Sequence, residues 1–121
     1  MKKTIQQISE DFSKHHFDNT FPYFSDTIEW HLIGDKVLIG KENIMETCRQ
    51  SAQYLSSVTT KFKKFKTIIS DNCVVIDSLA DYIDENSAVI TISSCDIYEF
   101  IDGKLSEITS YCIELKDVKN G

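Results

Sequence analysis

The sequence holds few side chains suited to proton transfer, and the histidines come first because they titrate near neutral pH. His15 and His16 close an amphipathic segment, where a helix C-terminus favours a protonated imidazole for structural reasons alone. The open alternative is that one of the two caps the mouth of a neighbouring cavity. His31 follows Trp30 in a β-forming segment, so their side chains point to opposite faces of a strand. His31 is therefore a candidate catalytic base beside Trp30 only if a bulge changes the strand register.

The cysteines do not form a metal-binding or disulfide pattern. They stand at positions 48, 73, 95 and 112, with no C-x-x-C pair and no histidine at ligand spacing. No signal-peptide core follows the first three residues, so we expect free, mostly buried thiols in a cytoplasmic protein. No glycine-rich phosphate loop occurs either. The sequence predicts neither a bound metal nor a cofactor.

Length and composition indicate one compact domain over residues 1–121. Hydrophobic residues make up 41% of the chain, and no run of 18 apolar residues is present to span a membrane. The formal net charge of −6 disfavours binding to nucleic acid. One basic stretch, residues 61–66, alternates lysine with phenylalanine. One interpretation is that this stretch binds single-stranded nucleic acid. The overall negative charge favours the other, a β-strand with its lysines on the solvent-exposed face.

Hydrophobic periodicity predicts helices first and a run of long strands afterwards. The expected helices cover 5 to about 15 or 16, a short segment starting at Asp18, and 41–56. The expected strands cover 28–33, 37–39, 58–70, 73–84, 87–101 and 104–115, separated by turn-forming residues. The core is placed at about 5–115, and the polar tail 116–121 is expected to fray. This order is typical of an α+β domain with a curved antiparallel sheet.

Three segments resemble a known family. They are 24–32, with its tryptophan-bearing strand, 40–44, which opens the long helix, and 96–105, which crosses the last hairpin. Together they resemble the nuclear transport factor 2-like superfamily and its SnoaL-like group, which contains polyketide cyclases and has ketosteroid isomerase as a relative. The resemblance implies a cone-shaped α+β barrel, in which a curved, mainly antiparallel sheet wraps around a long helix. It also implies a hollow in the cone that holds ligands.

The resemblance gives the inward direction of side chains that alternation places on common faces. The cavity residues it implies are Trp30, Leu32, Cys48, Leu55, Ile92, Ser94, Asp96, Ile108, Ser110 and Cys112. Asp96 matches the isomerase aspartic acid that donates a hydrogen bond to an oxyanion, and burial would raise its pKa. The alternative is a structural Asp96 tied to a neighbouring hydroxyl group. Trp30 is either a core aromatic residue or a platform for a flat ligand.

The catalytic sets of the family are incomplete in this sequence. The isomerase base falls at Trp30, whose indole cannot accept a proton, and the first-helix tyrosine has no counterpart. The favoured function is therefore binding of a small apolar or aromatic molecule in the cone. The alternative is a cofactor-independent isomerase, cyclase or dehydratase that uses Asp96 as general acid or oxyanion donor. Ile97, Ile101 and Ile113 share the convex sheet face, where the family packs a second copy, so a homodimer is expected.

Overall fold

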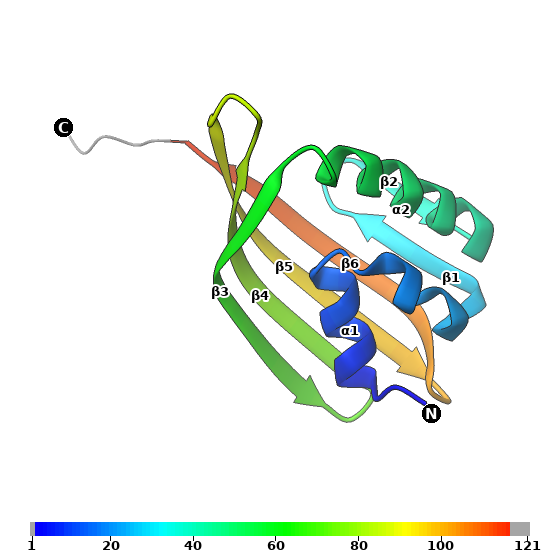
Figure 1. Cartoon of the computed structure of the whole chain (residues 1–121). Helices are drawn as coiled ribbons and strands as arrows, with labels where there is room; N and C mark the ends of the chain where they lie inside the picture. The colour runs from blue at the N-terminus through cyan, green and yellow to red at the C-terminus, as the bar shows by residue number, and fades with distance from the viewer. Residues whose placement is uncertain (1, 117–121) are drawn as a thin grey trace.

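A computed structural model describes residues 2–116, and its elements follow the order expected from the sequence (Figure 1). The helical elements are α1 (Ile5–Ser13), the 3-10 turns η1 (Phe17–Asn19) and η2 (Phe21–Tyr23), and α2 (Lys41–Leu55). The strands are β1 (Phe24–Leu32), β2 (Lys36–Ile39), β3 (Thr59–Ser70), β4 (Cys73–Ile83), β5 (Val89–Ile101) and β6 (Lys104–Leu115). Of the tail expected over 116–121, all residues after Lys116 lie outside the described part of the chain.

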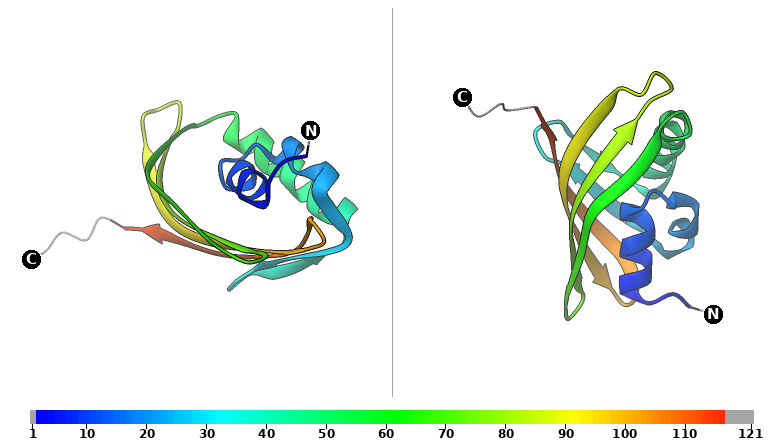
Figure 2. Two further views of the ribbon diagram at one scale, coloured as in Figure 1. Left: turned by 90° about the horizontal axis from the view of Figure 1, so that it is seen from below. Right: turned by 60° about the vertical axis from the view of Figure 1, so that its left-hand side comes forward.

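All six strands form one curved sheet in the order β2-β1-β6-β5-β4-β3. Strands β1 and β6 run parallel, whereas every other neighbouring pair is antiparallel. The helices lie on the concave face, and α1 sits inside the curve of the sheet (Figure 1 and Figure 2). The predicted α+β fold with a mainly antiparallel curved sheet is confirmed. The sheet stays open rather than closing into a barrel, because β2 and β3 are its two free edges.

The three hairpins of the meander follow from their turn residues. Asp102 and Gly103 both adopt positive φ angles, 50° and 78°, the combination that suits a two-residue hairpin. Asp71 also takes a positive φ, 51°, which aspartate tolerates better than most residues. In the longer loop between β4 and β5, the Asp84 carboxylate accepts hydrogen bonds from the backbone N–H groups of Asn86 and Ala88. These bonds hold the loop through residue 88, so β5 begins at residue 89 instead of the expected 87.

The first helix is shorter than predicted, and the second helix is replaced by two 3-10 turns. Helix α1 ends at Ser13 because His15 turns into the left-handed region with φ 70°. This turn brings the Phe17 ring against Phe12, with centroids 5.0 Å apart. The hydroxyl of Thr20 then donates to the Phe17 carbonyl at 2.6 Å, between η1 and η2, and Pro22 lacks the N–H that a continuous helix needs.

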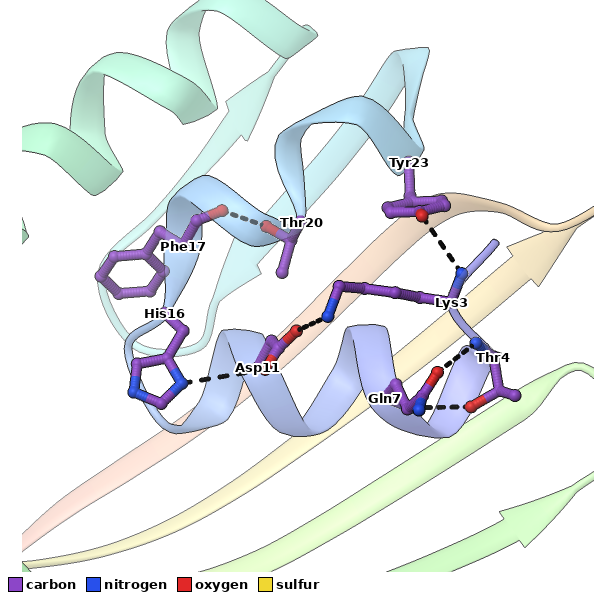
Figure 3. A network of polar contacts seen from close by, with 8 residues as sticks. All are labelled: Lys3, Thr4, Gln7, Asp11, His16, Phe17, Thr20 and Tyr23. Atoms are coloured by element: carbon purple, nitrogen blue, oxygen red, sulfur yellow. Dashed lines mark hydrogen bonds and ion pairs between the residues drawn. The ribbon is translucent and has the colours of Figure 1, made fainter. Parts of the chain in front are cut away.

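Polar contacts hold the start of α1 (Figure 3). Thr4 and Gln7 form a reciprocal capping box, with bonds of 3.1 and 2.9 Å. The Lys3 ammonium pairs with Asp11 at 2.9 Å, and the Lys3 backbone N–H donates to the Tyr23 hydroxyl at 3.1 Å. These contacts tie α1 to the segment that enters β1, and so they fix the face of α1 that meets the sheet.

The core lies between α1, α2 and the concave face at one end of the sheet. Its fully buried side chains include Ile8 of α1, Ile44 of α2 and Tyr98 of β5. A set of aromatic rings runs through the core. The rings of Phe12 and Trp30 make an edge-to-face contact, with their centroids 5.1 Å apart. This core fills only part of the concave face.

In the part of the chain that the structure describes, no helix has the length and apolar character needed to cross a membrane.

Candidate functional site

A cavity of about 330 Å³ opens in the concave face beside the core. Residues from α1, α2 and five of the strands contribute to it. Its apolar and aromatic lining is Phe12, Phe17, Trp30, Leu32, Tyr54, Leu55, Phe62, Tyr82 and Ile92. Its remaining lining is Ser13, His15, Ser51, Ser78, Ser94, Asp96, Ser110 and Cys112. The wall is thus largely apolar, with serine hydroxyls, the Cys112 thiol, the Asp96 carboxyl and the His15 imidazole set into it.

Eight of the ten side chains that the sequence analysis assigned to the cavity line it, and two do not. The eight are Trp30, Leu32, Leu55, Ile92, Ser94, Asp96, Ser110 and Cys112. Cys48 of α2 and Ile108 of β6 have no exposed surface and belong to the core. Burial raises the pKa of the Cys48 thiol to about 12. Strand alternation assigns a residue to the concave face, but it does not say which part of that face the helices cover.

Several lining residues were missed by the sequence analysis. Ser78 and Tyr82 lie on β4, whose buried and half-buried positions alternate, so the period of that strand would have found them. Ser13 and Phe62 carried no comparable signal. Ser13 lines the cavity because α1 lies across the sheet. Phe62 lines it because the register of β3 against β4 shifts between residues 62 and 64. Tertiary packing, rather than local pattern, puts these last two at the site.

A directed hydrogen-bond network surrounds Asp96. The indole N–H of Trp30 donates to the Ser110 hydroxyl at 2.9 Å, which leaves the hydroxyl hydrogen of Ser110 free to reach Asp96. On the other side, the Ser13 hydroxyl donates to Asp96 Oδ2 at 2.8 Å and lies 2.6 Å from the Tyr98 hydroxyl. Since Ser13 spends its only hydrogen on Asp96, it accepts the hydrogen of Tyr98. Both chains of donors therefore end at the carboxyl group.

The protonation of Asp96 reflects two opposed effects. Burial raises the pKa of the carboxyl, and the hydrogen bonds from Ser110 and Ser13, with the Tyr98 hydroxyl beside them, partly offset that rise. Asp96 still borders the cavity, which leaves part of its surface in contact with whatever fills the space. When protonated, the carboxyl of Asp96 supplies an O–H donor at the wall of the cavity. A ligand oxygen in the cavity is then an acceptor available to it.

His15 forms a second polar position on the cavity wall. Burial and the neighbouring His16 lower its pKa to about 4, so the imidazole is neutral at pH 7. Its Nε2 lies 3.4 Å from the Tyr82 hydroxyl, and the ring packs among Phe17, Phe62 and Tyr82. His16 instead points outward, 3.8 Å from the Asp11 carboxylate. Of the two adjacent histidines, the structure places His15 at the cavity.

His31 lies on the opposite, convex face of the sheet. The only irregularity in the pairing of β1 with β6 falls before Glu29, so Trp30 and His31 keep the simple alternation. The His31 Nε2 is 3.0 Å from Glu29 Oε1 and 3.8 Å from Glu107 Oε1. His31 therefore does not share the cavity with Asp96 and is not placed to act as its catalytic base.

The cavity suits an uncharged ligand better than an anion. Within residues 2–116, no lysine or arginine contributes to its lining. The Asp96 carboxyl would be negative when ionised, and burial opposes that charge. The His15 imidazole is neutral at pH 7 and supplies no positive charge. What remains is an aromatic enclosure with a carboxyl on one part of the wall and a neutral imidazole on another.

Comparisons with known proteins identify relatives by structure. No family model matches the sequence, and no curated protein matches it significantly. An NTF2-like protein of unknown function from Cytophaga hutchinsonii is 31% identical, with a TM-score of 0.79 over 88% of this chain and 94% of the other. An LEH-like epoxide hydrolase from M. tuberculosis gives 0.67 at 15% identity, over 90% and 82%. A Mesorhizobium loti protein, provisionally described as a SnoaL-like polyketide cyclase, gives 0.61 at 15% identity, over 88% and 94%.

Proposed function

The chain belongs to the NTF2-like superfamily, and from this premise we propose that its concave cavity binds a small, uncharged, aromatic or apolar molecule carrying a hydrogen-bonding oxygen. The observation that carries the proposal is the pairing of an apolar wall with the inward-facing carboxyl of Asp96. Ligand pockets in proteins have the same composition, with mostly apolar walls and a few placed polar groups.

The size of the cavity limits the ligand. Its volume of about 330 Å³ is near the lower end of the range for ligand pockets, about 300–1,000 Å³. A molecule of one or two rings fits such a space. Trp30 supplies a flat surface whose N–H is already bonded to Ser110, so its ring face is the part left for a ligand.

A neutral carbonyl compound makes a suitable first probe. Acetophenone offers one ring and one carbonyl oxygen for Asp96, whereas benzoate has a similar shape and a negative charge. Trp30 is the only tryptophan, so its indole N–H resonance reports occupancy of the cavity by NMR. We expect acetophenone to shift this resonance and benzoate to leave it unchanged at pH 7. Equal shifts by both compounds, or none by acetophenone, would contradict the proposal.

A pair of matched variants tests the location of the site. Ser94→Phe fills the cavity with a ring, while Ser93→Phe adds the same ring at the neighbouring position on the other face of β5. We expect S94F to abolish the acetophenone shift and S93F to retain it. Retention of the shift in a folded S94F protein would place the binding elsewhere.

A second candidate function is favoured by the placement of His15. A neutral imidazole and a carboxyl with a raised pKa line one cavity, which are the states that a general base and a general acid require. The corresponding activity is a cofactor-independent isomerisation, cyclisation or dehydration. In its first step, the imidazole of His15 takes a proton from the carbon next to a ligand carbonyl. The Asp96 O–H donates a hydrogen bond to the enolate oxygen that forms, and return of the proton completes the cycle.

Exchange of the acetophenone methyl protons for deuterium measures this proton abstraction directly. We expect the wild-type protein to accelerate exchange, and His15→Gln and Asp96→Asn each to remove the acceleration. His16→Gln is the control, since His16 points away from the cavity. Binding of acetophenone without any acceleration would leave the binding function and reject the catalytic one.

A further inference from the structure

A separate set of metal-ligating side chains gathers on the convex face, away from the cavity. Glu29 and His31 are two residues apart on β1 and so share one face of the strand. Glu107 of β6 is the direct cross-strand partner of Glu29. The three side chains are half-buried, and one ligand atom from each lies within 4.8 Å of the others. Two parallel strands thus present one nitrogen and two oxygen donors to a common point.

The spacing of the donor atoms matches a tetrahedral ion. Nitrogen and oxygen ligands lie about 2.0–2.2 Å from Zn²⁺, which puts two donors of a tetrahedron about 3.4 Å apart. The His31 Nε2 is 3.0 Å from Glu29 Oε1 and 3.8 Å from Glu107 Oε1. These distances bracket the expected value. The two glutamate oxygens lie within 4.8 Å of each other, and rotation of these long, half-buried side chains completes the geometry.

The surroundings leave an excess of negative charge. Glu99 of β5 stands directly opposite Glu107 on its other side, so three glutamates occupy one row across β1, β6 and β5. Among residues 2–116, the only cation-forming partner within 4.0 Å of any of the three is His31. Like charges directly opposite each other destabilise a sheet unless something neutralises them.

The row continues into an open hollow with a further donor type. Cys73 of β4 is the cross-strand partner of Glu99, and Cys73, Glu99 and Glu107 all border this hollow. The row therefore adds a sulfur donor to its carboxylates, and the nitrogen of His31 lies beside it. The hollow also gives an ion, and a water or ligand bound to it, a path to Glu107.

We propose that Glu29, His31 and Glu107 bind a divalent transition-metal ion of the Zn²⁺ type on the convex face. An imidazole with two carboxylates suits such an ion better than Mg²⁺ or Ca²⁺, which prefer oxygen ligands alone. Three protein donors leave a fourth position open to water or an added ligand. The site is independent of the cavity function, because the sheet separates the two.

The competing explanation is that a protonated His31 alone balances the glutamates. Calorimetric titration of the full chain with zinc chloride at pH 7.5 separates the two. We expect one zinc ion to bind, and His31→Ala and Glu107→Gln each to weaken this binding by at least about 10-fold, the loss that even outer-shell changes cause. Magnesium chloride at the same concentration is expected to give no binding.

Matched controls exclude incidental sites. His16→Ala removes a histidine that also lies near one carboxylate, at 3.8 Å from Asp11, and Glu46→Gln removes an exposed glutamate of α2. Both variants are expected to bind zinc as the wild type does. Zinc held by the thiols would survive H31A unchanged, which would overturn the proposal, as would the absence of binding to the wild type. Zinc-dependent shifts of the His31 ring resonances by NMR test the same ligand without any substitution.

Discussion

Replacing Ser13 by alanine is expected to cost far more stability than the same change at Ser9, one turn earlier on α1. Both serines are buried, with 7% and 0% of their surface exposed. The Ser9 hydroxyl donates only to the Ile5 carbonyl of its own helix, at 2.8 Å. The Ser13 hydroxyl joins two buried groups from β5, since it donates to Asp96 and accepts from Tyr98. The two substitutions remove the same atom from very different surroundings.

The magnitude follows from the partners left behind. A buried polar group that loses its hydrogen bond costs about 1–3 kcal/mol. Ser13→Ala affects two such groups, but the Tyr98 hydroxyl, released from Ser13, lies near enough to turn to Asp96, which limits the loss. We expect about 2–4 kcal/mol for S13A and less than about 1 kcal/mol for S9A. Unfolding entropy of about 2.1 cal/mol/K per residue converts 1 kcal/mol into about 4 °C for a chain of this length, so S13A lowers Tm by about 8–16 °C.

Two measurements check this reasoning. Urea unfolding followed by Trp30 fluorescence gives the free energy of unfolding for the wild type, S13A and S9A. Carboxyl NMR gives the pKa of Asp96, which is expected to rise further in S13A because the Ser13 hydrogen bond lowers it. If S13A costs no more than S9A, or leaves the Asp96 pKa unchanged, the network does not hold the carboxyl as described.

Three further predictions concern charge, thiols and assembly. Asp96 has a folded-state pKa above its unfolded value, so its contribution to stability is present at low pH and is lost as pH rises through the folded-state pKa. The free energy of unfolding of the wild type should therefore fall relative to Asp96→Asn as the pH rises above about 4, the unfolded-state pKa, and a pH-independent difference in urea unfolding would contradict this. A thiol reagent at pH 8 should modify Cys48 last, because the thiol is fully buried and its pKa is about 12; early loss of Cys48 by mass spectrometry would refute its burial. The homodimer stays a prediction, and light scattering should give twice 13.9 kDa rather than the single-chain mass.

The secondary structure was accessible from local pattern because local physics decides most of it. The turn at Asp102 and Gly103 needs positive φ at both residues, a demand that few residue pairs meet. The stripe of Ile44 and Cys48 on α2 predicts a buried helix face, and both side chains are fully buried. Where local signals competed, prediction was wrong. The segment after Asp18 has helix-compatible residues, but the Thr20 hydroxyl bond and Pro22 divide it into two 3-10 turns.

The candidate site was only partly predictable. Trp30 and Asp96 were assigned to one face, since alternation along a strand is a local property, and the family resemblance supplied the inward direction. His15 was left between two alternatives, because the direction of a side chain at a helix end depends on the turn that follows. The left-handed conformation of His15 settles that direction. It is supported by packing against Phe17 and Phe62, from segments far apart in the chain.

By itself, the sequence determined the element order, the faces of the strands and the family to which the chain belongs. The element order and the strand faces depend on spacing within a segment, which the chain carries locally, whereas the family came from the resemblance of segments 24–32, 40–44 and 96–105. Only the tertiary structure decided how far α1 covers the concave face, and hence that Ile108 is core while Ser110, two residues on, meets the cavity. It alone joined Glu29 and His31 to Glu107, 76 or more residues away, because register between distant strands is set by packing of the whole sheet. Spacing motifs cannot find such a cluster, since its members are neighbours only after the sheet has formed.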